Sequence, residues 1–187
     1  EYDDQGQVTR VIDRSGGVSE FEFDDAGRRV KRTDPEGNVE AWVFEDGRLV
    51  EHRDVDGGVS RWTYERRGWL IEFVDARGAT TRYQHDAAGN VVREKAPDGS
   101  ETLRRFDARG RVIAEVGPDG RTRTHTFDEE GNLARETLDD VPTEHRHDML
   151  GRRVETVDVS GRAIRQSYDP LGRRVARRDA DGVEQAW

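Results

Sequence analysis

The chain has 187 residues, a formal net charge of −9 and no cysteine, and 38% of its residues are charged while only 32% are hydrophobic. An acidic chain does not suit nucleic-acid binding, because phosphate contacts need a positive surface, and without cysteine there is neither a disulfide framework nor thiolate–metal chemistry. No apolar stretch approaches the roughly 18 residues of a transmembrane helix, and the start lacks a signal-peptide pattern, so we expect no membrane span.

A ring-bearing residue followed by an acid recurs every 21 residues from one end of the chain to the other, with two spacings of 20. The nine pairs are Tyr2/Asp3, Phe23/Asp24, Phe44/Glu45, Tyr64/Glu65, His85/Asp86, Phe106/Asp107, Phe127/Asp128, His147/Asp148 and Tyr168/Asp169. We call the first residue of each pair the ring position. A chain that consists entirely of repeats predicts a built surface or shell rather than one central pocket.

Glycines mark two turns in each repeat. One follows the ring position by four residues, as at Gly27, and a second comes ten residues later, as at Gly37. The Asp-x-x-Gly pattern predicts a type I turn whose carboxylate accepts backbone amides and whose glycine takes a positive φ. Two repeats deviate: the third reaches its first glycine one residue early, at Gly47, and the seventh lacks the second glycine over 138–142.

The segments between turns have the length and composition of strands. Residues 49–52, 91–94 and 112–115 are rich in β-formers, and glycine every ten residues disfavours helix. Rings two residues apart, such as Trp62 and Tyr64, share one face of a strand. The sequence therefore predicts an all-β fold: a repetitive antiparallel hairpin meander of about 18 short strands, forming a curved or spiralling sheet.

Twelve of the 14 aromatic residues occupy the ring position or the position two residues before it, and only Trp69 and Phe73 lie elsewhere. We expect these rings to form a stripe along one face that holds the sheet together. An aromatic platform for sugars is the alternative. If the stripe binds glycans, Trp42 and Trp62 should face solvent, whereas in a wall they should be packed. Because basic and acidic residues are interspersed, we also expect cross-strand ion pairs on solvated faces.

The segment His145-Arg146-His147-Asp148 is the strongest candidate for a metal or acid–base cluster, since histidines two apart on a strand share a face. However, His145 and His147 stand where other repeats carry rings, as do His85 and His125. We therefore interpret these histidines as ring replacements, and we predict no metal site and no cofactor.

Pairs of acids are frequent, but they fall in the turns, where capping of backbone amides explains them. Examples are Asp54 with Asp56, Asp139 with Asp140 and Asp179 with Asp181. Glycoside hydrolysis needs two carboxyls facing each other across a sugar, which this pattern does not predict. There is also no nucleophile elbow and no phosphate-binding glycine loop. We predict no catalytic residues and a protein that is not an enzyme.

The motif Tyr-Asp-x-x-Gly-Arg, as in residues 168–173, resembles the YD repeat of Rhs proteins, bacterial wall-associated proteins and teneurins, and the resemblance covers residues 1–187 in nine repeats. It implies a ribbon of β-sheet that spirals into a hollow cocoon, of which this chain is a fragment. The stretch Asp169-Pro170-Leu171-Gly172 lies in an ordinary turn and lacks the pattern of the core region that ends Rhs shells. No segment has the different composition expected of a separate toxin domain.

The resemblance implies a structural shell segment of a bacterial Rhs-type polymorphic toxin, which encapsulates a C-terminal toxin for delivery in interbacterial competition. Its expected partners are the encapsulated toxin domain, the remaining repeats of the parent protein and the secretion apparatus. The protein would be secreted, or delivered to the cell exterior by a secretion system. The alternative is a cell-surface adhesion or carbohydrate-binding repeat module, with carbohydrate as the partner.

Overall fold

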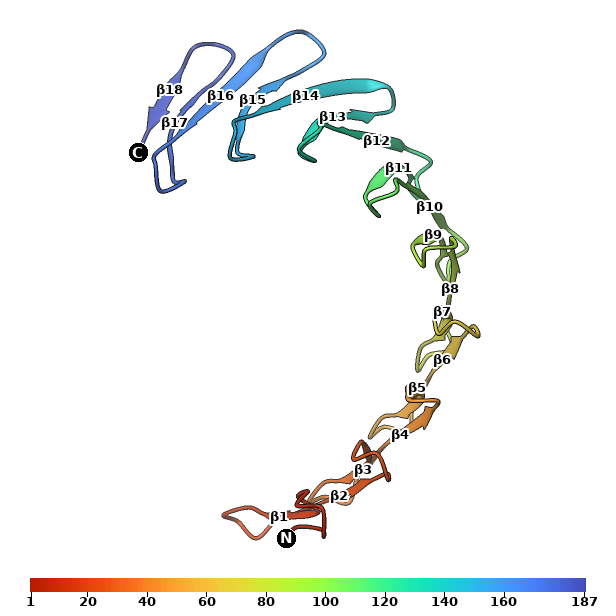
Figure 1. Ribbon diagram of the computed structural model, residues 1–187. Coiled ribbons are helices and arrows are strands. Elements are labelled where there is room, and N and C mark those ends of the chain that lie inside the picture. The colour runs from red at the N-terminus through yellow and green to blue at the C-terminus, as the bar shows by residue number, and fades with distance from the viewer. The chain divides into compact units, whose positions relative to one another are not determined.

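The computed structural model describes all residues from 1 to 187 and contains 18 strands and no helix (Figure 1). The strands are assigned to one open antiparallel sheet, so the predicted all-β meander and its number of strands are confirmed. The chain divides into two compact units, Glu1–His85 with Glu94–Ser100, and Asp86–Arg93 with Glu101–Trp187. Curvature into a cocoon remains a prediction.

In the first compact unit, consecutive strands pair antiparallel in chain order from β1 to β8. These strands are β1 (Arg10–Ile12), β2 (Val18–Phe23), β3 (Arg29–Thr33), β4 (Val39–Glu45), β5 (Arg48–Arg53), β6 (Val59–Tyr64), β7 (Leu70–Val74) and β8 (Thr80–His85). An isolated bridge between Tyr2 and Val8 precedes them. Strand β9 (Val91–Lys95) has residues in both compact units.

The second compact unit repeats this plan, and consecutive strands pair antiparallel from β10 to β18. Its strands are β10 (Glu101–Phe106), β11 (Val112–Val116), β12 (Thr122–Phe127), β13 (Leu133–Leu138), β14 (Val141–His147), β15 (Arg153–Val157), β16 (Ala163–Tyr168), β17 (Arg174–Arg178) and β18 (Glu184–Ala186).

The regular turns have the geometry predicted from Asp-x-x-Gly. At Asp107, the backbone N–H donates to the Arg111 carbonyl at 2.9 Å, and the Gly110 N–H donates back to the Asp107 carbonyl at 3.0 Å. The Asp107 carboxylate also accepts the N–H groups of Arg109 and Arg111 at 2.9 and 3.0 Å. All 17 glycines in the two turn positions have positive φ. This is a type I turn closed by a left-handed glycine, a common three-residue hairpin connection.

The two short repeats have a different turn. In the third repeat Glu45 pairs directly with Arg48, and the two residues between them, Asp46 and Gly47, have φ values of 46° and 80°. In the seventh repeat Leu138 pairs with Val141, and Asp139 and Asp140 have φ values of 49° and 67°. Two consecutive positive φ values define a type I′ hairpin turn. The tighter turn removes one residue, which explains both spacings of 20.

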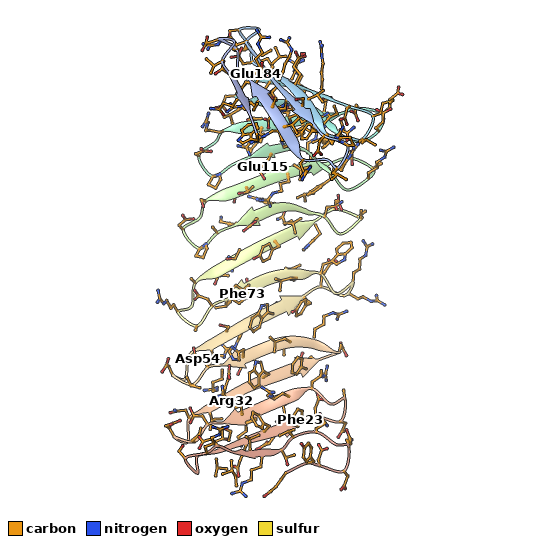
Figure 2. All side chains as sticks on the ribbon, turned by 90° about the vertical axis from the view of Figure 1, so that its left-hand side faces the viewer. Phe23, Arg32, Asp54, Phe73, Glu115 and Glu184 are labelled. Carbon is orange, nitrogen blue, oxygen red and sulfur yellow. The ribbon has the colours of Figure 1, made fainter.

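Each compact unit is a single layer of sheet with side chains on two surfaces and no second layer over either (Figure 2). No hydrophobic residue is fully buried anywhere in the chain. The two faces differ, because one carries the rings and the other carries cross-strand ion pairs. Examples of these pairs are Arg61–Glu51 at 3.0 Å, Arg82–Glu72 at 2.8 Å and Arg165–Glu155 at 2.7 Å. The predicted cross-strand pairing of charges is therefore confirmed.

Candidate functional site

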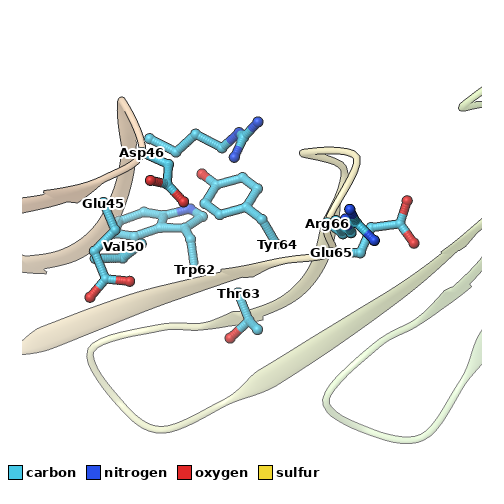
Figure 3. A pocket seen from close by; sticks show the side chains of 9 residues that line it. Glu45, Asp46, Val50, Trp62, Thr63, Tyr64, Glu65 and Arg66 are labelled. Carbon is cyan, nitrogen blue, oxygen red and sulfur yellow. The ribbon is translucent and has the colours of Figure 1, made fainter.

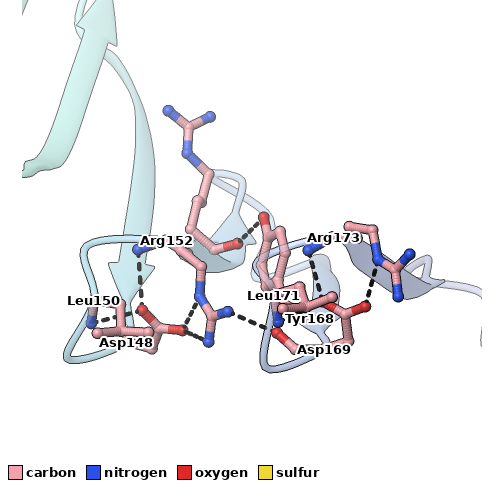
Figure 4. A network of polar contacts seen from close by, with 8 residues as sticks. Asp148, Leu150, Arg152, Tyr168, Asp169, Leu171 and Arg173 are labelled. Atoms are coloured by element: carbon pink, nitrogen blue, oxygen red, sulfur yellow. Dashed lines mark hydrogen bonds and ion pairs between the residues drawn. The ribbon is translucent and has the colours of Figure 1, made fainter.

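A recurring side-chain arrangement joins several repeats to the repeats that follow them. It involves the residue five positions after the ring position, which we call the stack position. Arg152 occupies this position in the eighth repeat, and its guanidinium is 2.7 Å from the Asp148 carboxylate of the same turn. The same guanidinium lies 5.0 Å from the centre of the Tyr168 ring and donates to the Asp169 carbonyl at 3.1 Å (Figure 4). The Arg152 side chain thus contacts both the aspartate of its own turn and the ring of the next repeat.

The contact recurs in both compact units. Arg28 lies 4.6 Å from the centre of the Phe44 ring and Arg111 lies 3.9 Å from that of Phe127. In the third repeat, whose turn is one residue shorter, Arg48 is four residues after the ring position and lies 5.9 Å from the centre of the Tyr64 ring. Arg28 and Arg111 are also ion-paired to the aspartate of their own turns, at 2.6 and 2.7 Å. A guanidinium over an aromatic face is attracted to the negative charge of the ring. The contact between repeats at these positions is therefore arginine on ring, not ring on ring.

Trp69 is the exception that the sequence singled out, and it occupies the stack position of the fourth repeat. Its ring centre is 5.5 Å from that of His85, the next ring position, and Arg67 lies 5.3 Å from the Trp69 ring centre. Phe73 is likewise explained, because it lies directly across the hairpin from Trp62 with ring centres 5.2 Å apart. Neither residue marks a separate site.

The turn carboxylates have one further property, a lowered pKa. Hydrogen bonds from the Arg152 side chain and from backbone amides hold the pKa of Asp148 below its ordinary value. At Asp107 the backbone N–H of Arg111 is the main cause of a lowered pKa. The sequence predicted that the paired acids cap backbone amides in the turns. This is confirmed at Asp54, whose carboxylate accepts the N–H groups of Asp56 and Gly58 at 3.0 and 2.7 Å.

The histidine segment lies on β14. The imidazole of His145 is buried, its Nδ1 is 3.2 Å from Thr156 Oγ1, and its Nε2 is 3.4 Å from Glu136 Oε1 without a hydrogen bond. Burial, and next the charge of Arg153, lower the pKa of His145. As predicted, His145 and His147 stand in the places of rings. No group of three or more His, Cys, Asp or Glu side chains is arranged to hold a metal ion.

An open cleft of about 400 Å³ lies beside the tight turn of the third repeat (Figure 3). Trp62 and Tyr64 form its aromatic side and Asp46 lies against it, while Thr63 projects from the other side of the strand. Trp62 is half-buried against Phe73, and Trp42 is half-buried and stacked on His52 with ring centres 5.4 Å apart. Both tryptophans are thus partly packed within the sheet, which is closer to the arrangement expected for a wall than to the full exposure expected for a glycan-binding stripe.

The model contains no helix long and apolar enough to cross a membrane.

A search among curated proteins finds no match. Several solved structures share the fold, including the following two. The crystal structure of TcdB2-TccC3-TEV has a TM-score of 0.57 and 16% sequence identity, over 94% of this chain and 12% of that one. A Photorhabdus luminescens Tc holotoxin pore with a mutation in TccC3 has a TM-score of 0.56 and 16% identity, over the same shares of the two chains. The chain thus spans about an eighth of the length of these structures.

A family model for the RHS Repeat matches residues 2–39, 64–101, 106–140 and 147–184, together most of the chain. The matched segments contain Arg28, Arg111 and Arg152 together with the aspartates of their own turns. Together with the fold shared with the Tc toxin components, this match shows that the chain belongs to the RHS-repeat family.

Proposed function

We propose that this chain is a wall segment of an encapsulating protein, in which RHS repeats enclose a C-terminal toxin for delivery from one bacterium to another. The partners in this proposal are the enclosed toxin domain, the remaining repeats of the parent protein and the machinery that exports it. The role is structural rather than catalytic, and the protein acts outside the cell that makes it.

The observation that carries the proposal is the recurring contact of a stack-position side chain with the next ring position, made by arginine in both compact units. Arg111 and Arg152 bind the aspartate of their own turn and the ring of the following repeat. A wall built in this way needs no central hydrophobic core, and none is present. Because each repeat depends only on its neighbours, the sheet can be extended repeat by repeat. Such a surface is suited to covering a large volume.

Relatives of known fold support the same conclusion. The holotoxin pore contains TccC3, which is also named in the TcdB2-TccC3-TEV structure, and this chain resembles a small part of each in fold. The acidic, polar composition also fits a wall with water on its surfaces, since 38% of residues are charged.

Protease protection in the parent protein tests the proposal. The parent would be expressed with an epitope tag at its C-terminus and treated with protease, intact and after mild denaturation. Encapsulation predicts that the C-terminal segment resists cleavage in the intact protein and is cut once the wall opens. A segment cut equally fast in both samples would refute encapsulation.

The cleft at Trp62 and Tyr64 favours the second candidate, a carbohydrate-binding module. Aromatic faces beside carboxylate and guanidinium groups suit sugar rings and their hydroxyls, and Asp46 and Arg48 line this cleft. A glycan array would compare the wild-type chain with Trp62→Ala, and Trp42→Ala is the matched control because Trp42 does not line the cleft. Saturable glycan binding that is lost only in Trp62→Ala would support this candidate. If no glycan binds, containment is the one remaining candidate.

A further inference from the structure

Three histidines gather on one face of the second compact unit, on alternate strands. His125 lies on β12, His145 and His147 lie on β14, and Glu136 on β13 stands between them. The corresponding places in the first compact unit include Trp62 and Phe73, whose tilted rings are in contact with centres 5.2 Å apart. Imidazoles keep the flat shape of a ring but gain a positive charge on acidification. Trp62 and Phe73 carry no group that gains a proton.

His145 is the most enclosed of these side chains, with only 2% of its surface exposed. Its neighbours are Thr156 on β15, whose hydroxyl is hydrogen-bonded with Nδ1 at 3.2 Å, and Glu136 on β13, at 3.4 Å from Nε2. Nε2 has no hydrogen-bond partner, so a proton added there would be buried without a well-formed bond.

The charges around His145 do not favour a buried cation. His147 is two residues away on the same face and lies directly opposite Arg153 of β15. Glu136 is the one carboxylate close to the His145 ring, and it also lies opposite His125 of β12. Asp128 is engaged by the side chain of Asn132, at 3.0 Å. Protonation of His145 would therefore add a positive charge beside Arg153, which is already charged. The nearby carboxylate, Glu136, lies between His145 and His125 and cannot pair fully with both.

We propose that strands β13, β14 and β15 form an acid-sensitive seam, which opens locally when His145 is protonated while the strands of the first compact unit stay paired. Burial, and next the charge of Arg153, lower the pKa of His145 while Glu136 acts against them, and the net lowering agrees in direction with the proposal. The folded state holds the neutral imidazole, so its advantage is present above the ordinary pKa of 6.5 and is lost as the pH falls below that value. The proposal goes beyond containment and is tested on the chain alone.

Hydrogen exchange read by mass spectrometry locates such an opening. Protection factors, corrected for the intrinsic effect of pH on exchange, would be measured at pH 7.5 and 5.5. We expect a several-fold loss of protection at pH 5.5 in peptides from β13 to β15, and no such loss in β6 and β7, where Trp62 stands in a histidine's place and Phe73 in that of Glu136. Equal behaviour of the two regions would overturn the proposal.

Two variants separate titration of His145 from a general effect of acid. His145→Phe keeps a ring of the kind that Phe21 provides at the equivalent place, and it should abolish the acid-induced loss of protection. His52→Phe, in the first compact unit, is the matched control and should leave that loss unchanged. If His145→Phe does not fold, Glu136→Gln decides, because removing the shared carboxylate should increase the acid-induced loss. The proposal would be refuted if β13 to β15 became more protected in acid, whether in the wild-type chain or in a folded variant.

Discussion

The guanidinium of Arg152 lies 5.0 Å from the centre of the Tyr168 ring while it is ion-paired to Asp148 of its own turn at 2.7 Å. The arginine is thus fixed at one end by local sequence and at the other by the following repeat. Tyr168 in turn donates its hydroxyl proton to the Arg153 carbonyl at 2.9 Å. In a sheet without a buried core, such links add side-chain contacts between repeats to the backbone hydrogen bonds of the strands.

Replacing Arg152 by alanine should therefore destabilise the second compact unit. The substitution removes the cation–π contact with Tyr168 and the hydrogen bond to the Asp169 carbonyl. We expect a loss of about 1 kcal/mol in the free energy of unfolding, as is usual for a partly buried contact of this kind. Urea denaturation followed by tyrosine and tryptophan fluorescence measures it.

Arg109→Ala is the matched control for that experiment. Arg109 is an exposed turn arginine with no ion pair and no ring contact, so its removal should change stability by less than about 0.5 kcal/mol. If Arg152→Ala proved no more destabilising than Arg109→Ala, the stack position would have no special role.

Acid should weaken the turns through their carboxylates. The pKa of Asp107 is lowered, first by the N–H of Arg111, so the folded state favours the ionised form. The stabilisation is therefore complete above the ordinary value of 3.8 and is lost as the pH falls through the lower folded value. We expect the midpoint of thermal unfolding to fall steeply below pH 4. Asp107→Asn should lower that midpoint at pH 7 and flatten its dependence on pH, and an unchanged pH profile would contradict this origin.

The turn glycines are required for their backbone conformation rather than for space. Gly161 has a φ of +81°, and a Cβ added there would have no atom within 4 Å. Gly161→Ala should therefore cost about 1 kcal/mol from the left-handed conformation alone. Gly161→Asn should cost less, because asparagine tolerates this conformation better than alanine. Differential scanning calorimetry of the two variants gives the comparison, and equal losses would point to another cause.

The fold was predictable from the sequence because its signals are local. Glycine positions determine the turns, and rings two residues apart determine which face of a strand they share. The arginine contact was missed, although Gly-Arg at the end of the motif recurs and was a usable signal. Its partner lies in the next repeat, so Arg152 reads as a solvated charge until β16 is placed beside the turn. The burial of His145 was missed for the same reason, since it depends on Glu136 and Thr156 of the two neighbouring strands.

The tight turn of the seventh repeat offers a test in the stabilising direction. Asp139 and Asp140 both have positive φ, which side chains resist, whereas the equivalent turn of the third repeat has glycine in its second place, at Gly47. Asp140→Gly makes the seventh turn an Asp-Gly pair, the favoured sequence for a type I′ hairpin. The side chain of Asp140 makes no hydrogen bond or ion pair, so little is lost. We expect a gain of about 1 kcal/mol in unfolding free energy by urea denaturation.

The neighbouring substitution should have the opposite effect. The Asp139 carboxylate accepts the Arg121 guanidinium at 2.8 Å and the Thr122 N–H at 2.9 Å, so Asp139→Gly relieves the same backbone strain but removes both contacts. A type I′ turn therefore predicts that Asp140→Gly stabilises the hairpin and that Asp139→Gly does not. Destabilisation by Asp140→Gly would mean that residue 140 does not hold a left-handed conformation in solution.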